Sequence, residues 1–542
     1  MLKVMNLTIR VNNIVLDLDD SMEKLPDLVA KKLGVAEQQV KDWTVIRQSV
    51  DARKKDRVVF VYTVDVNLQG NEAQVLKRQE RNPHVSTPKT CFYAQISPGT
   101  KRLLGRPIVV GTGPAGLFAA LTLAQWGYRP LVLERGQGVA QRTQDVQHFW
   151  ATGELQPDSN VQYGEGGAGT FSDGKLTTRV NDPRIRLILE EMVAAGAPEE
   201  ILYLHKPHVG TDRLRTVVQN LRNKIIELGG QVRFGAKVTA LLTEGDRITG
   251  VVVNDQEELV SSAVILAVGN SARDTYKQLL KQDVQLQAKP FAIGVRIEHP
   301  QSRIDLAQYG KFAGHPKLGA ADYQLVYKNE ELDRAAYTFC MCPGGSVIAA
   351  ASDFNGVVTN GMSAHARDTG VANSALVVSV GQEDFLDDSP LGGMYLQQQC
   401  EHIAFRLAGS NYQAPAQTVG DFLAERPSNQ LGALGTYQPG LVSADVGQCL
   451  PEPVSQMLRA ALPDMDRRLK GFAADEAVLT GVETRTSAPV RINRGEDFQA
   501  LGWEGLFPAG EGAGYAGGIM SAAIDGMRVA EGLITIYGKG DR

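Results

Sequence analysis

Residues 108–116 read Ile-Val-Val-Gly-Thr-Gly-Pro-Ala-Gly, and this stretch decides the fold. An apolar run, Ile108 to Val110, precedes the glycines, and a helical pattern, Leu117–Trp126, follows them. A second apolar run, Leu131–Leu133, comes next and ends at Glu134. A strand, a glycine-rich turn, a helix and a further strand make a βαβ unit. The sequence therefore predicts an α/β fold built on a parallel sheet.

The three glycines of this stretch have different physical tasks. Gly111 permits the tight turn out of the strand, Gly113 lets the backbone approach a pyrophosphate, and Gly116 lets the helix pack closely on the sheet. Unpaired N–H groups at the positive end of the helix dipole hold the pyrophosphate. Glu134 would accept hydrogen bonds from ribose hydroxyls and would repel a 2′-phosphate. The unit favours FAD or NAD over NADP, and a βαβ unit without a ligand is the alternative.

A second glycine-rich segment lies near the end of the chain. Residues 505–510 form an apolar strand that ends in small residues, and Glu511 and further glycines follow it. A helix is expected after these glycines, at about 521–534, and its N-terminus would be a positive dipole end. Twenty-two of the 56 glycines lie in residues 105–175 and 502–532. The two segments are expected to meet around one dinucleotide, and a flexible loop after Glu511 is the alternative.

The composition places the chain among ordinary globular proteins. Of 542 residues, 43% are hydrophobic and 22% charged, and 56 Lys and Arg against 61 Asp and Glu give a net charge of −5. This balance offers no general attraction for nucleic acid or anionic lipid. Five scattered cysteines argue against a disulfide framework and a thiolate metal site, so we expect no metal and a cytoplasmic location. We expect no membrane span at 107–128, because four glycines interrupt that uncharged stretch.

The N-terminal residues show the periodicities of strands and of one helix. Strands are expected at Val4–Val11, Trp43–Ser49 and Val58–Val66. Asp20 and Glu23 have the spacing of a capping box that opens a helix. Residues after these strands become polar and rich in proline, which is typical of a linker.

Composition and periodicity divide the chain into five expected segments. The expected segments are a small N-terminal α/β (ferredoxin-like) domain at 1–70, a linker at 71–106, the first part of a Rossmann-like FAD-binding domain at 107–285 with a β-rich insert at about 205–262, a large inserted α+β cap or substrate domain at 286–474, and the second part of the FAD-binding domain at 475–542.

The motifs together resemble those of the glutathione-reductase-like superfamily of FAD enzymes. There, a strand that ends in Gly-Asp reaches the ribityl chain, and here Glu511 takes the place of the Asp. Residues 164–175 resemble the glycine loop that wraps the pyrophosphate and the flavin edge, and 264–269 resemble the short strand beside the cofactor. The resemblance implies FAD as cofactor. The contacts it implies are those of Gly111, Gly113, Pro114, Ala115, Gly116, Glu134, Arg135, Gly166, Gly167, Gly169, Thr170, Ser172, Lys175, Lys237, Val238, Ala267, Gly269, Gly510, Glu511, Gly518, Ile519 and Met520.

Within that superfamily the chain is similar, over nearly its full length, to the bacterial FAD-dependent or NAD(FAD)-utilising dehydrogenases. The similarity includes the extra N-terminal unit and the segments 337–345 and 483–492. It implies an FAD-dependent oxidoreductase that moves a hydride through flavin N5 to or from an unnamed small molecule, with NADH or NADPH as a transient reductant. The alternative is a flavin-binding protein whose N-terminal domain acts on a macromolecule such as tRNA. Net charge and the lack of a basic aromatic motif in 1–68 argue against nucleic acid.

Side chains outside these motifs leave the catalytic residue unassigned. A dithiol mechanism next to the ribose acid is disfavoured, because no cysteine lies between Cys91 and Cys340. Strand alternation would place Cys340 and Cys342 on one face as small core residues, and a redox pair is the alternative. Arg485 and Arg491 are candidates to clamp a substrate carboxylate or phosphate, or to tie the insert to the flavin domain through ion pairs.

Overall fold

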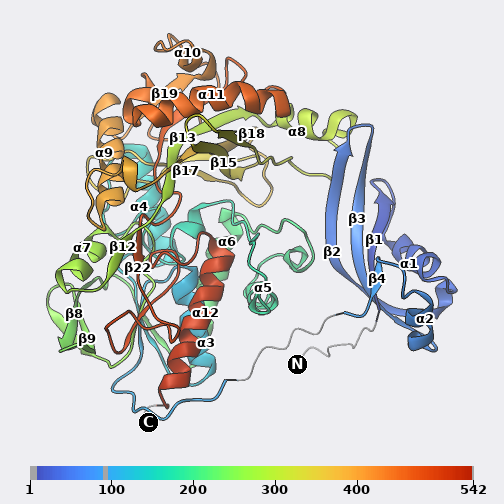
Figure 1. Cartoon of the computed structure of the whole chain (residues 1–542), viewed down its shortest axis with the longest axis horizontal. Helices are drawn as coiled ribbons and strands as arrows, with labels where there is room; N and C mark the ends of the chain where they lie inside the picture. The colour runs from blue at the N-terminus through green and yellow to red at the C-terminus, as the bar shows by residue number, and fades with distance from the viewer. Residues whose placement is uncertain (1–8, 89–95, 540–542) are drawn as a thin grey trace.

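A computed structural model gives the structure of the chain and describes residues 9–88 and 96–539. The first residues of the strand expected at Val4–Val11, and Cys91, lie outside the described residues. Three sheets, of four, five and seven strands, organise the described part (Figure 1). Helices pack on these sheets, and smaller two- and three-stranded sheets connect them.

The five-stranded sheet is parallel and contains the βαβ unit read from the sequence. All its neighbouring strands run in the same direction. Four of its strands are short, fully buried apolar runs, as expected for a sheet with both faces covered, whereas the edge strand at 231–233 is polar and partly exposed. The α/β fold with a Rossmann-like sheet is thereby confirmed. In spatial order, the strands are β23 (Leu506–Pro508), β11 (Val264–Leu266), β5 (Ile108–Val110), β6 (Leu131–Leu133) and β7 (Gln231–Arg233).

The helices next to this sheet bring its two distant halves together. α3 and α12 lie side by side (Figure 1). Gly526 permits this approach, because a Cβ there would lie 2.1 Å from the carbonyl oxygen of Ala115. Their buried faces form one apolar core with α5 and α6. The helices are α3 (Pro114–Gln125), α4 (Val139–Thr152), α5 (Arg184–Ala194), α6 (Thr211–Glu227), α7 (Arg273–Lys281) and α12 (Ile519–Ile536).

A small antiparallel meander occupies residues 238–260, the second half of the segment at about 205–262 where a β-rich insert was expected; the first half contains α6 and β7. Its order is β10-β9-β8, and it packs near a separate two-stranded ladder of β12 with β22. The strands are β8 (Val238–Glu244), β9 (Arg247–Val253), β10 (Glu257–Val260), β12 (Leu286–Ala288) and β22 (Val490–Ile492).

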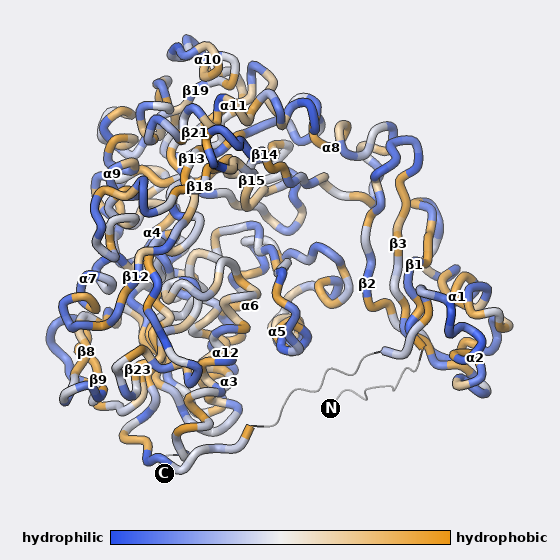
Figure 2. The backbone as a smooth tube through the Cα atoms, viewed as in Figure 1, coloured by the Kyte–Doolittle hydropathy of each residue, from blue (hydrophilic) through white to orange (hydrophobic). Residues whose placement is uncertain are grey.

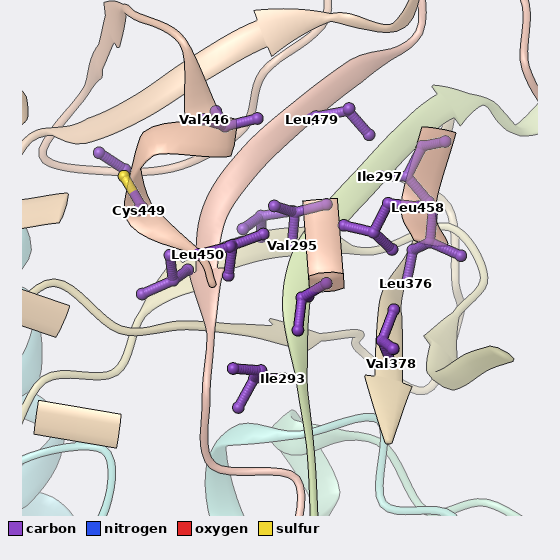
Figure 3. Close-up of a cluster of buried hydrophobic side chains, with 14 of the residues drawn as sticks. Ile293, Val295, Ile297, Leu376, Val378, Val446, Cys449, Leu450, Leu458 and Leu479 are labelled. Atoms are coloured by element: carbon purple, nitrogen blue, oxygen red, sulfur yellow. The ribbon is translucent and has the colours of Figure 1, made fainter. Parts of the chain in front are cut away.

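The seven-stranded sheet is mainly antiparallel and has the order β14-β15-β18-β13-β21-β19-β20. Its core joins Ile293, Val295 and Ile297 to side chains of the neighbouring strands and of α11 (Figure 3). Figure 2 colours the same strands by hydropathy; the apolar residues of β13 are interrupted by Arg296, Glu298 and His299. The strands are β13 (Phe291–Pro300), β14 (Val326–Asn329), β15 (Arg334–Cys342), β18 (Val371–Val380), β19 (Ala414–Thr418), β20 (Leu441–Ser443) and β21 (Val478–Glu483).

Four helices and a hairpin accompany this sheet. They are α8 (Gln301–Tyr309), α9 (Gly392–Leu407), α10 (Val419–Leu423), α11 (Glu452–Arg468), β16 (Ser346–Ala349) and β17 (Thr359–Met362). β21 was expected in the second part of the FAD-binding domain. It pairs instead with β13 and β19, and all six of its residues are buried.

The N-terminal sheet has the order β2-β3-β1-β4, and its neighbours are antiparallel. With its two helices this is the βαββαβ arrangement of a ferredoxin-like unit. Its elements are β1 (Ile9–Asp17), α1 (Leu25–Leu33), β2 (Val40–Lys54), β3 (Arg57–Leu68), α2 (Glu72–Arg78) and β4 (Val85–Ser86).

Two details of this unit differ from the sequence expectation. α2 and β4 occupy the first half of the expected linker at 71–106, because Val75 packs into the apolar core and β4 pairs with β1. The cap before α1 is made by Ser21, whose Oγ accepts from the N–H of Glu23. Asp20 forms an ion pair with Lys24 instead.

The N-terminal sheet is fixed to the rest of the molecule by main-chain hydrogen bonds. The N–H of Gln48 in β2 donates to the carbonyl of Tyr203 at 2.8 Å, and the N–H of His205 donates to the carbonyl of Gln48 at 2.8 Å. Phe312 and Leu318 also pack against its apolar core. Separately, no helix within 9–88 and 96–539 is both long and apolar enough to cross a membrane.

Candidate functional site

A cavity of about 1890 Å³ is lined by residues of all three large sheets. Ligand pockets usually measure about 300–1,000 Å³, so this one has room for a cofactor and a second molecule. Most of the contacts expected from the sequence line it. They are Gly111, Gly113, Pro114, Ala115, Glu134, Arg135, Gly167, Gly169, Ser172, Lys175, Lys237, Val238, Ala267, Gly269, Glu511, Gly518 and Ile519.

Five of the expected contact residues lie behind the cavity wall. Gly116 has no room for a side chain, because a Cβ would lie 2.0 Å from the carbonyl oxygen of Gly111. A Cβ at Gly166 would lie 2.1 Å from Oγ1 of Thr170. The N–H of Gly510 donates to Asp525 at 2.7 Å, and Met520 is buried in the core. These residues shape the wall from behind.

Two helices point their N-termini into the cavity. α3 begins after Gly113 and α12 begins after Gly518, and neither has a side chain that caps it. Both glycines and the first helical residues, Pro114 and Ile519, line the cavity. Uncapped N–H groups and a positive dipole end favour a bound anion. The two glycine-rich segments of the sequence therefore meet at one place.

Several glycines of the wall are not explained by the protein itself. A Cβ at Gly517 or Gly518 would have no protein atom within 4 Å, and one at Gly113 would have only Cα of Gly167, at 3.9 Å. Gly113 (φ −66°) and Gly518 (φ 167°) adopt backbone conformations that any residue can take. The space that their side chains would fill is cavity space. A ligand that lies against the backbone explains the choice of glycine.

Glu134 organises the turn at the end of β6. Its carboxylate accepts from the N–H and Oγ1 of Thr112, at 2.9 and 2.6 Å, and from the N–H groups of Gly136 and Gly164, at 2.9 and 3.0 Å. It is only 4% exposed, yet it lines the cavity. Glu134, the residue expected to bind the ribose, thus also links the glycine turn after β5 to the glycine loop that begins at Gly164.

Cationic side chains at this end of the cavity are held by acids. The Arg135 guanidinium lies 4.2 Å from the centre of the Tyr163 ring and pairs with Asp158 and Asp274. Nζ of Lys237 lies 2.7 Å from Asp274. Arg135 and Lys237 therefore have fixed positions where the adenosine end is expected.

Glu511 follows β23 and faces the cavity. Burial raises the pKa of Glu511 to about 7, although Asn270 and the Lys289 charge act in the opposite direction. Nδ2 of Asn270 donates to Glu511 at 2.9 Å. A glutamate in the usual aspartate position is thus compatible with the site.

Glu511→Gln is expected to change how stability depends on pH in the FAD-free chain. A carboxyl whose pKa is raised on folding contributes stability that is full below pH 4.5 and is lost as pH rises through about 7. The thermal midpoint of the wild type should therefore fall, relative to the variant, between these values. Thermal melts across this range would check it, with exposed Glu496→Gln as control. An unchanging difference between wild type and Glu511→Gln would contradict it.

The glycine loop is tied to the seven-stranded sheet. Asp173 pairs with Lys175 at 2.6 Å and with Arg367 at 2.5 Å, and Nζ of Lys175 also donates to the carbonyl of Met341. Lys175 was expected from the sequence, whereas Arg367 was missed. Its position 192 residues after Lys175 left no local signal.

The expectation that Cys340 and Cys342 share a face is wrong. A bulge interrupts β15 between Phe339 and Cys342, and Cys340 has φ +41°. The extra residue reverses the alternation, so Cys340 is exposed to the cavity while Cys342 is 2% exposed. Both thiols are free, and burial raises the pKa of Cys342.

Arg485 lies in a buried ion-pair network. Its guanidinium donates to Glu401 at 3.0 Å and to Oγ of Ser352 at 2.5 Å. Arg273, the first residue of α7, also donates to Glu401 at 2.7 Å and to Asp353 at 2.6 Å. This geometry favours the alternative in which Arg485 ties the insert to the flavin domain through ion pairs, over a role in binding a substrate anion.

Arg491 is not among the cavity-lining residues. Its guanidinium lies 5.4 Å from the centre of the Tyr515 ring. A second buried pair, which the sequence did not reveal, reaches the cavity through its acid: Nε of Arg296 donates to Glu483 at 2.9 Å, and Glu483 lines the cavity. Nη1 of Arg296 donates to the carbonyl of Cys340 at 3.0 Å, and burial raises the pKa of Glu483.

The fold and site define a flavoprotein with a Rossmann-like sheet, and comparison with known proteins gives the same class. Residues 290–486 match the family "FAD-dependent protein, C-terminal domain-like", and residues 109–173 match "NAD(P)-binding Rossmann-like domain". Residues 8–67 match a domain of unknown function. An uncharacterised protein of Clostridium beijerinckii is 48% identical over 529 residues, which are 97% of this chain and 99% of that protein. The chain belongs to the same family as this Clostridium protein. The match to an FAD-dependent protein family gives FAD as its cofactor.

More distant likenesses cover less or match less well. Digeranylgeranylglycerophospholipid reductase of Haloferax volcanii is 28% identical over 38% of this chain and 43% of its own length. Glycine oxidase of Bacillus cereus has a TM-score of 0.34 and 10% identity, with 79% of this chain and 94% of that chain covered. A likeness at that level adds nothing to the fold described above. Nothing in these comparisons supports action on tRNA.

Proposed function

We propose that the chain is an oxidoreductase of the bacterial FAD-dependent, NAD(FAD)-utilising dehydrogenase kind, which acts on a small molecule. The observation that carries the proposal is the meeting of two uncapped helix N-termini at glycines whose side chains would fill only cavity space. Both features suit a dinucleotide that lies against the backbone. The volume beyond one ligand suits a substrate in the same cavity.

The chain's own residues would bind and orient the cofactor. The N-termini of α3 and α12 would hold negative charge on the pyrophosphate and on the pyrimidine end of the ring. Glu134 would accept from the adenosine ribose, and Glu511 would face the ribityl hydroxyls. When bound, FAD supplies two-electron transfer, which amino-acid side chains lack. Residues of β15, β17 and β21 would cover the reacting side and keep water away.

We also propose a revised division of the chain. The cap would extend through residue 486, because β21 is an interior strand of the seven-stranded sheet, between β13 and β19. The N-terminal unit would extend to about residue 86, because β4 completes its sheet. The cytoplasmic location stays a prediction.

The purified protein is expected to be yellow with bound FAD, and anaerobic NADH or NADPH is expected to bleach it. Absorbance spectra recorded after each addition would identify the donor. Bleaching by neither would leave the substrate itself as the hydride source. A colourless protein that cannot be reconstituted with FAD would refute the proposed function.

A further inference from the structure

We propose that the cavity contains a built substrate chamber for a small amphiphile, a molecule with an apolar body and one anionic group. The chamber is the part of the cavity lined by residues 10–63 and 177–207. This inference rests on the proposed function and names the substrate class for that site.

The charge of this wall is one-sided. Its basic lining residues are Arg10, Arg47, Arg179, His205 and Lys206, and no Asp or Glu from these two segments lines the cavity. The whole chain carries −5, so the basic wall is not a general property of the surface. A cleft lined by one sign of charge concentrates ligands of the opposite sign.

Two of these charges lack a carboxylate partner among the residues that the structure describes. Lys206 is matched by Asp322 at 2.8 Å, and Arg10 by Asp65 at 2.7 Å. Arg47 contacts the ring of His205 at 2.8 Å, and burial together with the Arg47 charge lowers the pKa of that histidine. Arg179 is exposed to the cavity and forms no ion pair there. Arg47 and Arg179 are therefore the two charges open to an anion.

Apolar side chains make up the rest of the wall. Ile46, Ile185, Leu189, Ile201 and Leu202 all line it. Tyr337 and Phe339 of β15 line the same cavity from the seven-stranded sheet. Such a lining stabilises a hydrocarbon body, whereas a wall for a free inorganic anion would need none of it.

The wall is fixed in place by the fold. Helices α1 and α2 pack on the apolar face of the N-terminal sheet, to which Ile9 and Val11 belong. Arg10 and Asn12 alternate with these residues and line the cavity from the other face. The main-chain bonds of Gln48 to Tyr203 and His205 attach this sheet beside the glycine loop, which continues directly into 177–181.

Calorimetric titration of the full FAD-loaded chain with octanoate and with 1-octanol tests the chamber. Octanoate is expected to bind at least about tenfold more tightly than octanol, because only octanoate forms charge-assisted hydrogen bonds. The double variant R47Q/R179Q should raise the octanoate Kd about tenfold and leave that of octanol unchanged. R47K/R179K, which keeps both charges, should retain most of the octanoate affinity.

The control is R81Q/R406Q, which removes two exposed arginines outside the cavity lining and should bind octanoate like the wild type. The inference fails if octanoate binds no better than octanol, or if R47Q/R179Q and the control R81Q/R406Q bind octanoate with the same affinity. It also fails if inorganic phosphate binds as tightly as octanoate, or if tRNA binds and loses affinity only in R47Q/R179Q. The flavin spectrum is recorded on the same samples. A loss of octanoate binding can therefore be distinguished from a loss of bound FAD.

Discussion

Glu401→Gln is expected to destabilise the chain by about 3–5 kcal/mol, because it leaves two buried arginines without their main partner. Glu401 is 1% exposed and receives hydrogen bonds from Arg273, Arg485 and the hydroxyl of Thr484. Asp353, the other acid of the network, is 31% exposed on its side chain and cannot neutralise both cations. The loss should appear as a lower midpoint of denaturant unfolding.

The same substitution has a pH signature. The two arginines hold the pKa of Glu401 well below its ordinary value of 4.5. A carboxyl with a lowered pKa contributes stability that is present above the ordinary value and is lost as pH falls below it. The gap between wild type and Glu401→Gln should therefore narrow below about pH 4.5. Asp27→Asn, which breaks an exposed pair with Lys31, is the control and should cost about 0.5 kcal/mol. Equal effects of the two variants would contradict the role of the network.

Gly113→Val is expected to weaken FAD binding while the protein still folds. The backbone at Gly113 accepts any residue, and the new side chain would project into the cavity. Overfilling a close contact costs about 1–3 kcal/mol, so FAD should bind roughly 10- to 100-fold more weakly. Gly113→Ala should lie between valine and the wild type.

Flavin content and FAD titration would measure the affinity, and thermal melts of the FAD-free variants would measure folding. Gly356→Ala is a matched control, since its Cβ would have ordinary contacts, the nearest at 3.4 Å, outside the cavity lining. Full FAD occupancy in Gly113→Val would show that the cofactor does not approach this backbone.

The parts of the fold that the sequence predicted depend on neighbouring residues. The βαβ unit is confirmed because a strand, a glycine turn and a helix are contiguous at 108–126. The sequence also predicted that the two glycine-rich segments meet. Each segment connects a strand of the five-stranded sheet to the N-terminus of the next helix, α3 or α12. Patterns of this kind can be identified from a stretch of about 20 neighbouring residues.

The features that the sequence did not predict depend on distant partners or on a single irregular residue. One extra residue at the bulge in β15 reversed the orientation of Cys340. Arg367 reaches Asp173, and Arg273 reaches Glu401, across more than 100 residues. The basic wall likewise combines strands of the first 63 residues with a loop near 205. The periodicity of hydrophobic residues along the sequence does not indicate which distant residues pair in this way.

The order of the parallel sheet also sets the order of events when the chain is made. β5 and Gly113 emerge early, but β23 and the N-terminus of α12 complete the site about 400 residues later. Contacts between such distant segments form slowly, because the loop between them must close first. The N-terminal sheet, with all its strands inside residues 9–86, can fold while synthesis continues. Tight flavin capture must wait until the last helix has left the ribosome, so nascent or C-terminally truncated chains should remain unpigmented.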